Sequence, residues 1–259
     1  MTKVEFIEKL RAAVSSYSDA ISTADGQWAV KGFIDVHKHI YTISNDTKVV
    51  SKIVELYLFP LLCKFAKDNN CELELAKEQN YYPDITFKDS EGKLFAVDVK
   101  SSYRKSATKI KGMTLGAFTG CFRDRQSTKN VTHPYDEYAA HVVLGIIYSD
   151  NGADVDESEF YSLSQLEQIQ SVVKDFTFFV QEKWRIAVDR PGSGNTKNIG
   201  SVSEIDALIN GRGPFAVLGE EIFDDYWMNY LTIDMARKAE LAKPYYTDIE
   251  SYKEFRHLK

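Results

Sequence analysis

The sequence lacks the features that mark membrane-spanning, secreted and repeat proteins. No apolar run approaches the roughly 20 residues that a membrane-spanning helix requires. Residues 1–14 contain acidic side chains and follow a helical period, which is not the pattern of a secretory signal. Internal repeats and low-complexity tracts are also missing. We therefore expect a cytoplasmic globular protein.

Cysteine is scarce, with Cys63, Cys71 and Cys121 in a chain of 259 residues. Their spacing matches neither a zinc knuckle nor a Cys-x-x-Cys redox pair. Free cysteines are usually buried, so we expect three buried, reduced thiols.

Positive charge is in the minority, since 32 lysines and arginines face 38 acidic residues and the formal net charge is −6. By itself this balance argues against a nucleic-acid partner. Three stretches nevertheless carry a local basic excess: residues 99–112, 122–130 and 183–197. Because basic stripes on an acidic protein can focus phosphate groups into a cleft, the charge pattern leaves solvated loops and nucleic-acid binding equally open.

Hydrophobic residues make up 44% of the chain, enough for a substantial core. Apolar periodicity and capping residues predict helices over residues 3–17, 46–67, 157–173, 203–210 and 218–230, with Pro60 kinking or breaking the second of these. Strands are predicted within residues 20–44 and over 71–76, 140–148 and 176–188, with a hairpin over 84–101. This mixture without strict βαβ alternation indicates an α/β or α+β sheet with flanking helices.

The predicted hairpin over residues 84–101 carries the most informative pattern. Side chains alternate in direction along a strand, so Asp98 and Lys100 share one face while Val97 and Val99 face the core. A carboxylate and an ammonium therefore stand two residues apart on the same side of the sheet.

The position of the turn predicts which residues of the hairpin face each other. The turn is centred near residues 90–91, so paired positions add to about 181 or 182 and Asp84 lies opposite residue 97 or 98. Mg²⁺ prefers oxygen ligands such as the converging Asp84 and Asp98 carboxylates, and it keeps waters for a substrate phosphate. A lysine beside the metal can orient or activate a water and stabilise negative charge at phosphorus. A solvated surface hairpin is the alternative, because Asp-x-Lys is common in charged proteins.

Pro83-Asp84 followed by Asp98-Val99-Lys100 matches the signature of the PD-(D/E)xK nuclease superfamily. Further collinear matches are Asp46-Thr47-Lys48-Val49, Glu55-Leu56, Gln79-Asn80, Tyr82, Tyr103, Thr114-Leu115-Gly116, Thr128-Lys129-Asn130, Asp136, Tyr138, Ala140-His141, Lys183-Trp184, Gly192-Ser193-Gly194-Asn195-Thr196, Asn198-Ile199-Gly200-Ser201 and Asp225-Tyr226-Trp227. Together they make the chain resemble the EcoRV-like type II restriction endonucleases over residues 46–227, about 70% of its length. The superfamily signature is weakly specific, whereas its combination with the run from 192 to 201 is strongly specific.

The resemblance implies a restriction-endonuclease-like α/β fold, with a central mixed β-sheet flanked by helices. It implies a U-shaped homodimer that holds double-stranded DNA in a cleft, in a bacterial cytoplasm. We expect one domain over residues 1–259, with a dimerisation region at about 18–45 and a catalytic and DNA-binding region at 46–259.

The resemblance also assigns the catalytic residues. Asp84, Asp98 and Lys100 would be the catalytic set, and Mg²⁺ would be held by Asp84 and Asp98. Glu55 would be an auxiliary acid near the metal; apart from the resemblance, it reads as a solvated helix residue beside Ser51.

The DNA contacts that the resemblance implies fall in three groups. They are a major-groove recognition loop of Gly192, Ser193, Gly194, Asn195, Thr196, Lys197 and Asn198; a minor-groove and backbone loop of Gln79 and Asn80; and Thr47, Lys48, Tyr103, Thr114 and Lys129. The residue types suit these roles, since glycines allow close backbone approach, Asn195 can pair with adenine, and Thr196 can contact a thymine methyl. A P-loop is excluded because G-x-x-x-x-G-K-[ST] is absent, and a plain flexible turn is the alternative.

The implied reaction is Mg²⁺-dependent hydrolysis of both strands of a palindromic site, GATATC, cut at its centre to blunt ends with 5′-phosphates. A cognate DNA methyltransferase would protect the host. Two differences from the family pattern bear on the expected target and dimer. Lys197 stands where the family has a small polar residue, and residues 31–44 look like an insertion of about ten residues near the dimer interface. Within that insertion His37 and His39 fit two imidazoles on a strand better than a metal site. Residues 231–259 match poorly, so no phosphate contact is assigned there.

Two other functions stay open on the sequence alone. A related nuclease with a different target would keep the same catalytic residues. A non-catalytic DNA-binding relative would keep the scaffold without turnover, although the intact Asp84, Asp98 and Lys100 give that alternative no support.

Overall fold

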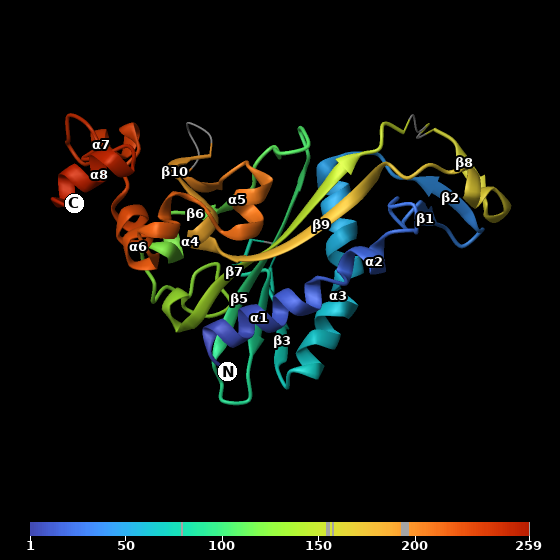
Figure 1. Ribbon diagram of the computed structural model, residues 1–259, viewed down its shortest axis with the longest axis horizontal. Helices are drawn as coiled ribbons and strands as arrows, with labels where there is room; N and C mark the ends of the chain where they lie inside the picture. The colour runs from blue at the N-terminus through green and yellow to red at the C-terminus, as the bar shows by residue number, and fades with distance from the viewer. Residues whose placement is uncertain (79, 154–155, 157, 193–196, 259) are drawn as a thin grey trace.

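The computed structural model describes residues 1–78, 80–153, 156, 158–192 and 197–258. Its centre is a five-stranded sheet in the order β3–β4–β5–β7–β9 (Figure 1). These strands are β3 (Glu72–Leu75), β4 (Ile85–Lys88), β5 (Leu94–Tyr103), β7 (Tyr138–Asp150) and β9 (Val173–Glu182). β5 and β7 are parallel and the other neighbours are antiparallel, so the sheet is mixed, as predicted.

Two long helices cover one face of this sheet. They are α1 (Lys3–Val14) and α3 (Thr47–Asp68). Between them the chain passes through α2 (Tyr17–Ile21) and then residues 22–46. Phe6 of α1 is fully buried and stacks on Phe95 of β5 with ring centroids 4.2 Å apart. Asp46 caps α3, accepting from the backbone N–H groups of Lys48 and Val49, which agrees with the predicted start of this helix.

The other face of the sheet packs against a small sheet and the C-terminal helices. The small sheet has the order β10–β11–β6 and consists of β10 (Ala187–Pro191), β11 (Asn198–Ser201) and β6 (Thr114–Ala117). The helices are α4 (Lys183–Ile186), α5 (Ile205–Asn210), α6 (Glu220–Asn229), α7 (Ile233–Lys238) and α8 (Ile249–Arg256). Trp227 and Tyr226 of α6 lie in this second core. One end of the molecule is therefore rich in packed aromatic rings.

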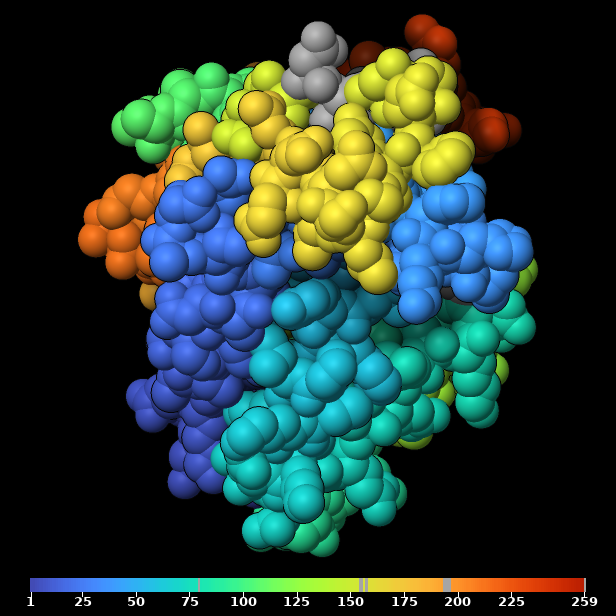
Figure 2. All heavy atoms as spheres, turned by 90° about the vertical axis from the view of Figure 1, so that its right-hand side faces the viewer, coloured from blue at the N-terminus to red at the C-terminus, as the bar shows by residue number. Residues whose placement is uncertain are grey.

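A third sheet lies at the opposite end of the molecule from α7 and α8 (Figure 1). It has the order β1–β2–β8, from β1 (Gly32–Ile34), β2 (His39–Thr42) and β8 (Phe160–Ser162). Its β1–β2 hairpin lies within the segment that looks like an insertion. Figure 2 looks onto this end, where residues 32–42 and 158–168 lie side by side.

Two sequence predictions are wrong, and a third is contradicted in part. The helix predicted over 157–173 is not formed by the described residues 158–173, because Phe160–Ser162 pair with β2 and a short 3₁₀ segment, Leu163–Gln168, follows. Pro60 does not break α3, which continues to Asp68, so of the two predicted effects only a kink stays a prediction. Cys63 is exposed and the other two cysteines are half-buried, although all three are free as predicted.

No helix within the described residues is both long enough and apolar enough to cross a membrane. The sheets and helices instead bury their apolar faces against one another, in the cores described above.

Candidate active site

Strands β4 and β5 bring the two predicted carboxylates together. They pair so that Ile85 faces Val97, and the same register sets Asp84, the residue just before β4, opposite Asp98. The Asp84 N–H donates to Asp98 Oδ1 at 3.3 Å, and the Val99 N–H donates to Asp84 Oδ2 at 2.8 Å. The hairpin register that the sequence predicted is therefore confirmed.

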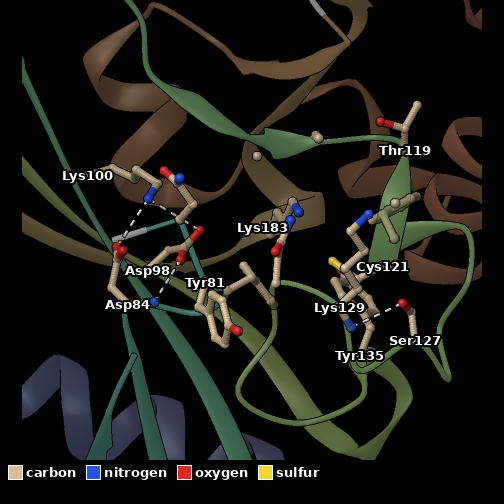
Figure 3. Close-up of a pocket in the computed structure, with 17 residues that line it drawn as sticks. Tyr81, Asp84, Asp98, Lys100, Thr119, Cys121, Ser127, Lys129, Tyr135 and Lys183 are labelled. Carbon is tan, nitrogen blue, oxygen red and sulfur yellow. Dashed lines mark hydrogen bonds and ion pairs between the residues drawn. The ribbon is translucent and has the colours of Figure 1, made fainter. Parts of the chain in front are cut away.

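Lys100 joins the two carboxylates from the same face of β5. Its Nζ lies 3.2 Å from Asp84 Oδ2 and 3.4 Å from Asp98 Oδ2. The Asp98 side chain is 8% exposed, whereas those of Lys100 and Asp84 are 24% and 40% exposed. The three side chains meet in one group (Figure 3), and Asp98 is the least exposed of them.

The electrostatics of the group favour a bound cation. Burial and the charge of Asp98 raise the pKa of the Asp84 carboxyl. Burial acts to lower the pKa of Lys100, but the negative charges of Asp98 and Asp84 outweigh it, so this pKa lies above its ordinary value. Two carboxylates thus share one ammonium, which leaves an excess of negative charge.

The two carboxylates suit magnesium better than a metal whose ligands must all come from the protein. Within the ranges that the structure describes, no group of three or more His, Cys, Asp and Glu side chains lies close enough to hold a metal ion. Mg²⁺ commonly binds through one or two carboxylates and completes its shell with water and substrate phosphate. Asp84 and Asp98 fit that requirement.

A cavity of about 580 Å³ opens directly above this group. Asp84, Asp98 and Lys100 line one side of it, and Lys129 lies on the far side (Figure 3). Two aspartates and three lysines are among the residues that line it, and these charged groups suit a charged substrate segment rather than a small apolar ligand.

The cavity also contains residues that the sequence reasoning did not single out as site residues. They include Thr119, Tyr135 and Lys183. Lys183 follows β9 directly and is the first residue of α4, so strand alternation did not extend to it. Its neighbours could not be predicted, because they come from distant parts of the chain.

The structure does not bring Glu55 together with the two aspartates. Its carboxylate is 38% exposed and pairs with Lys52 Nζ at 2.9 Å. One turn earlier on α3, Ser51 Oγ hydrogen-bonds Ser101 Oγ at 2.6 Å. The turn of α3 that carries Glu55 therefore lies beside the segment of β5 that carries Lys100.

Some predicted DNA-binding residues line cavities. Asn80 and Lys129 line the cavity with the aspartates. Thr114, Gly192 and Asn198 line a second cavity of about 570 Å³ beside β11. The Gly192 N–H donates to the Asn198 carbonyl at 3.2 Å, so the flanks of the predicted recognition loop are held together.

Other predicted DNA-binding residues lie elsewhere. Thr47 and Lys48 are exposed in the first turn of α3, and Tyr103, at the end of β5, has Lys111 Nζ 5.5 Å from its ring centre. Lys197 is exposed, and its carbonyl accepts from the Phe118 N–H. Gln79 and the loop residues Ser193, Gly194, Asn195 and Thr196 lie outside the described residues.

Two acids on neighbouring strands beside a lysine are typical of nucleases, and comparison with known proteins identifies the family. The family model described as "Restriction endonuclease EcoRV" matches residues 24–257. The type II restriction enzyme EcoRV of Escherichia coli is 36% identical over 243 residues, which cover 92% of this chain and 95% of that protein. The chain therefore belongs to the EcoRV family of type II restriction endonucleases.

A solved structure, the NlaIV restriction endonuclease, is a more distant likeness. The comparison covers 93% of this chain and 90% of that one, with 14% identity and a TM-score of 0.39. A likeness this distant adds nothing to the family assignment.

Proposed function

We propose that this protein is a Mg²⁺-dependent endonuclease that cuts both strands of a short palindromic DNA site. Membership of the EcoRV family supports restriction endonuclease activity. The single observation that carries the mechanism is the convergence of Asp84 and Asp98 on Lys100, at 3.2 and 3.4 Å from its Nζ, beneath an open cavity.

Asp84 and Asp98 would hold the metal. When bound there, Mg²⁺ supplies a Lewis acid that offsets negative charge on the scissile phosphate. Asp98 is nearly buried and Asp84 is more exposed, so the pair presents one fixed carboxylate and one that is open to the cavity. A phosphate that enters the cavity would therefore approach from the side of Asp84.

Lys100 acts on the attacking water and on the reacting phosphate. Its ammonium is held within ion-pair distance of both carboxylates, so it can orient a water for in-line attack and stabilise charge at phosphorus. The bond to the 3′-oxygen breaks as the water oxygen bonds to phosphorus, and the products carry 5′-phosphate and 3′-hydroxyl ends.

Glu55 completes the proposal as an auxiliary acid. It stands on the turn of α3 next to β5, and it would have to leave Lys52 to act near the metal. Its contribution is therefore expected to be smaller than that of either aspartate.

The proposed target is GATATC, cut at its centre to blunt ends. Support comes from the run Gly192–Thr196, whose Asn195 and Thr196 suit an adenine and a thymine methyl. Lys197 adds a cation next to this run and tunes phosphate or base contacts there. Asn80, on the wall of the cavity, is proposed to contact the minor groove or backbone, with Gln79 beside it in the sequence.

A palindrome requires one active site for each strand, and a two-fold dimer supplies both. We propose that a single domain dimerises through residues 18–45 and the neighbouring β8. This end of the molecule exposes apolar side chains, including Phe33 at 52%, Ile34 at 58% and Phe160 at 53%, which a partner chain would cover. A U-shaped dimer with DNA between the two copies follows from that arrangement.

The proposal implies a functional partner in the host. A nuclease that recognises GATATC would cut the genome of its own cell, so a DNA methyltransferase of the same specificity must modify those sites. No physical contact between the two proteins is required.

The mechanism is tested by neutralising each carboxylate in turn. Asp84→Asn and Asp98→Asn should abolish cleavage of a GATATC duplex in Mg²⁺, while Asp68→Asn, at an exposed carboxylate on α3, serves as the matched control and should cut normally. Folding is checked by thermal unfolding of each variant. Wild-type cleavage by a folded Asp84→Asn or Asp98→Asn protein would overturn the assignment.

A further inference from the structure

Lys183 is a buried cation that the mechanism above does not use. It follows β9, is 4% exposed, and forms no ion pair or hydrogen bond with its side chain among the residues that the structure describes. Its Nζ lies 5.4 Å from the ring centre of Tyr82, 5.2 Å from that of Phe122 and 5.7 Å from that of Tyr135. Three aromatic faces thus surround one ammonium.

Aromatic faces compensate a buried ammonium only in part. A charged group without a hydrogen-bonding counterion is costly to bury, and burial lowers the pKa of Lys183 to about 8. Buried lysines are normally paired. An anionic group that reached the Lys183 ammonium would therefore offset the cost of burying its charge.

The ammonium faces the cavity above the two aspartates. Lys183 lines that cavity, and its side chain lies between the Asp98 group and the wall that carries Lys129 (Figure 3). Gly116 lines the same part of the wall at a φ of +97°, and a Cβ there would stand 3.5 Å from Lys183 Nζ. Glycine at this position leaves the approach to the ammonium open to a ligand.

The sheet sets the spacing between Lys183 and the aspartates. Val142 of β7 pairs with Glu182 of β9 and with Val97 of β5, so Lys183 lies two strands across from the segment around Asp98. Two strand spacings amount to about 10 Å. A ligand held by Lys183 is thus close to the reacting phosphate without coinciding with it.

We propose that Lys183 binds a backbone phosphate of the cleaved strand, next to the scissile phosphate, and so anchors the strand across the cavity. The inference rests on the proposed nuclease function and deepens it by adding a phosphate-binding residue. A phosphodiester supplies the counterion that Lys183 lacks, and the aromatic rings hold the stem of the side chain so that the ammonium is aimed before DNA arrives.

The test combines one variant with a scan of modified DNA. Lys183→Met keeps the length and packing of the side chain and removes its charge. Self-complementary GATATC duplexes, each with a neutral methylphosphonate at one backbone position in both strands, are titrated with the protein in Ca²⁺. Lys64→Met is the matched control, because Lys64 is exposed on α3.

We expect the Lys183→Met substitution and the neutralisation of a phosphate to have non-additive effects on DNA affinity at one backbone position. Wild type and Lys64→Met should lose about 10- to 100-fold in affinity when the phosphate held by Lys183 is neutralised. Lys183→Met should bind the unmodified duplex more weakly by a similar factor, lose nothing further at that position, and match wild type elsewhere in the scan. The slope of log K against log salt should also be less steep by about 0.9 for each Lys183 in the dimer.

The outcomes separate this inference from the proposed function. Failure of the wild type to bind or cut the unmodified duplex would overturn the proposed function itself. Normal wild-type binding, with a Lys183→Met scan that parallels wild type at every position, would overturn the inference alone. Coupling at the scissile phosphate instead of a neighbouring one would also contradict it. If Lys183→Met does not fold, Lys183→Gln is examined by the same scan.

Discussion

Replacing Lys183 by methionine is predicted to stabilise the folded protein even as it weakens DNA binding. The pKa of Lys183 falls from an ordinary 10.5 to about 8, chiefly because burial disfavours its charged form. With about 1.4 kcal/mol for each pH unit, the charged side chain lowers the free energy of unfolding by roughly 3 kcal/mol at neutral pH. Methionine forgoes cation–π contacts worth about 0.5–2 kcal/mol, so we expect a net gain of about 1–2 kcal/mol.

The gain in the free energy of unfolding depends on pH in a direction set by the lowered pKa of Lys183. Below pH 8 Lys183 is protonated in both states, and the folded state carries the full penalty. Between about pH 8 and 10.5 the unfolded chain binds more protons than the folded one, so the penalty shrinks as pH rises. The stability difference between Lys183→Met and wild type should therefore be largest near pH 7 and should decline above pH 8.

Urea unfolding of both proteins at pH 7 and pH 10 measures this difference, with Lys64→Met as a control for removing an exposed lysine. Changes common to all three proteins, such as tyrosine ionisation, cancel in the comparison. A Lys183→Met protein that is less stable than wild type at pH 7, by an amount that does not vary with pH, would refute the reasoning.

Three further predictions concern catalysis and packing. Lys100→Met should slow cleavage of a cognate duplex by roughly 10²- to 10³-fold in a single-turnover assay while retaining DNA binding in Ca²⁺; an unchanged rate would contradict the role of its ammonium. Gly145→Ala should lower the free energy of unfolding by about 1–3 kcal/mol, because a Cβ would lie 2.1 Å from the Phe179 ring, and a neutral effect in urea unfolding would mean that the ring can move away. Phe6→Ala should lower it by about 3–5 kcal/mol since Phe6 stacks on Phe95 in the core; a loss below about 1 kcal/mol would contradict that packing.

Local patterns were sufficient to predict the hairpin that brings Asp84, Asp98 and Lys100 together. Alternation along β5 separated Asp98 and Lys100 from the core, and the turn position set the register that places Asp84 opposite Asp98. The start of α3 was also readable, because Asp46 caps it through side-chain hydrogen bonds to nearby N–H groups. In each case the deciding interactions lie within a few residues or one hairpin.

Features that depend on distant parts of the chain could not be predicted. The segment 160–162 became a strand because β2, more than a hundred residues earlier, pairs with it. The setting of Lys183 depends on Tyr82, Phe122 and Tyr135, which come from three separate segments. Neither the hydrophobic period nor the charge pattern carries information about such long-range contacts.

The most direct test of the central claim is digestion of two plasmids in Mg²⁺, one with a single GATATC site and one without. We expect that only the first is converted to a linear product, with blunt, 5′-phosphorylated ends, and that Asp98→Asn protein cuts neither. Cutting of both plasmids at another shared sequence would retain the nuclease and refute the proposed target. If folded wild-type protein cuts neither plasmid, or if Asp98→Asn cuts as well as wild type, the account is contradicted.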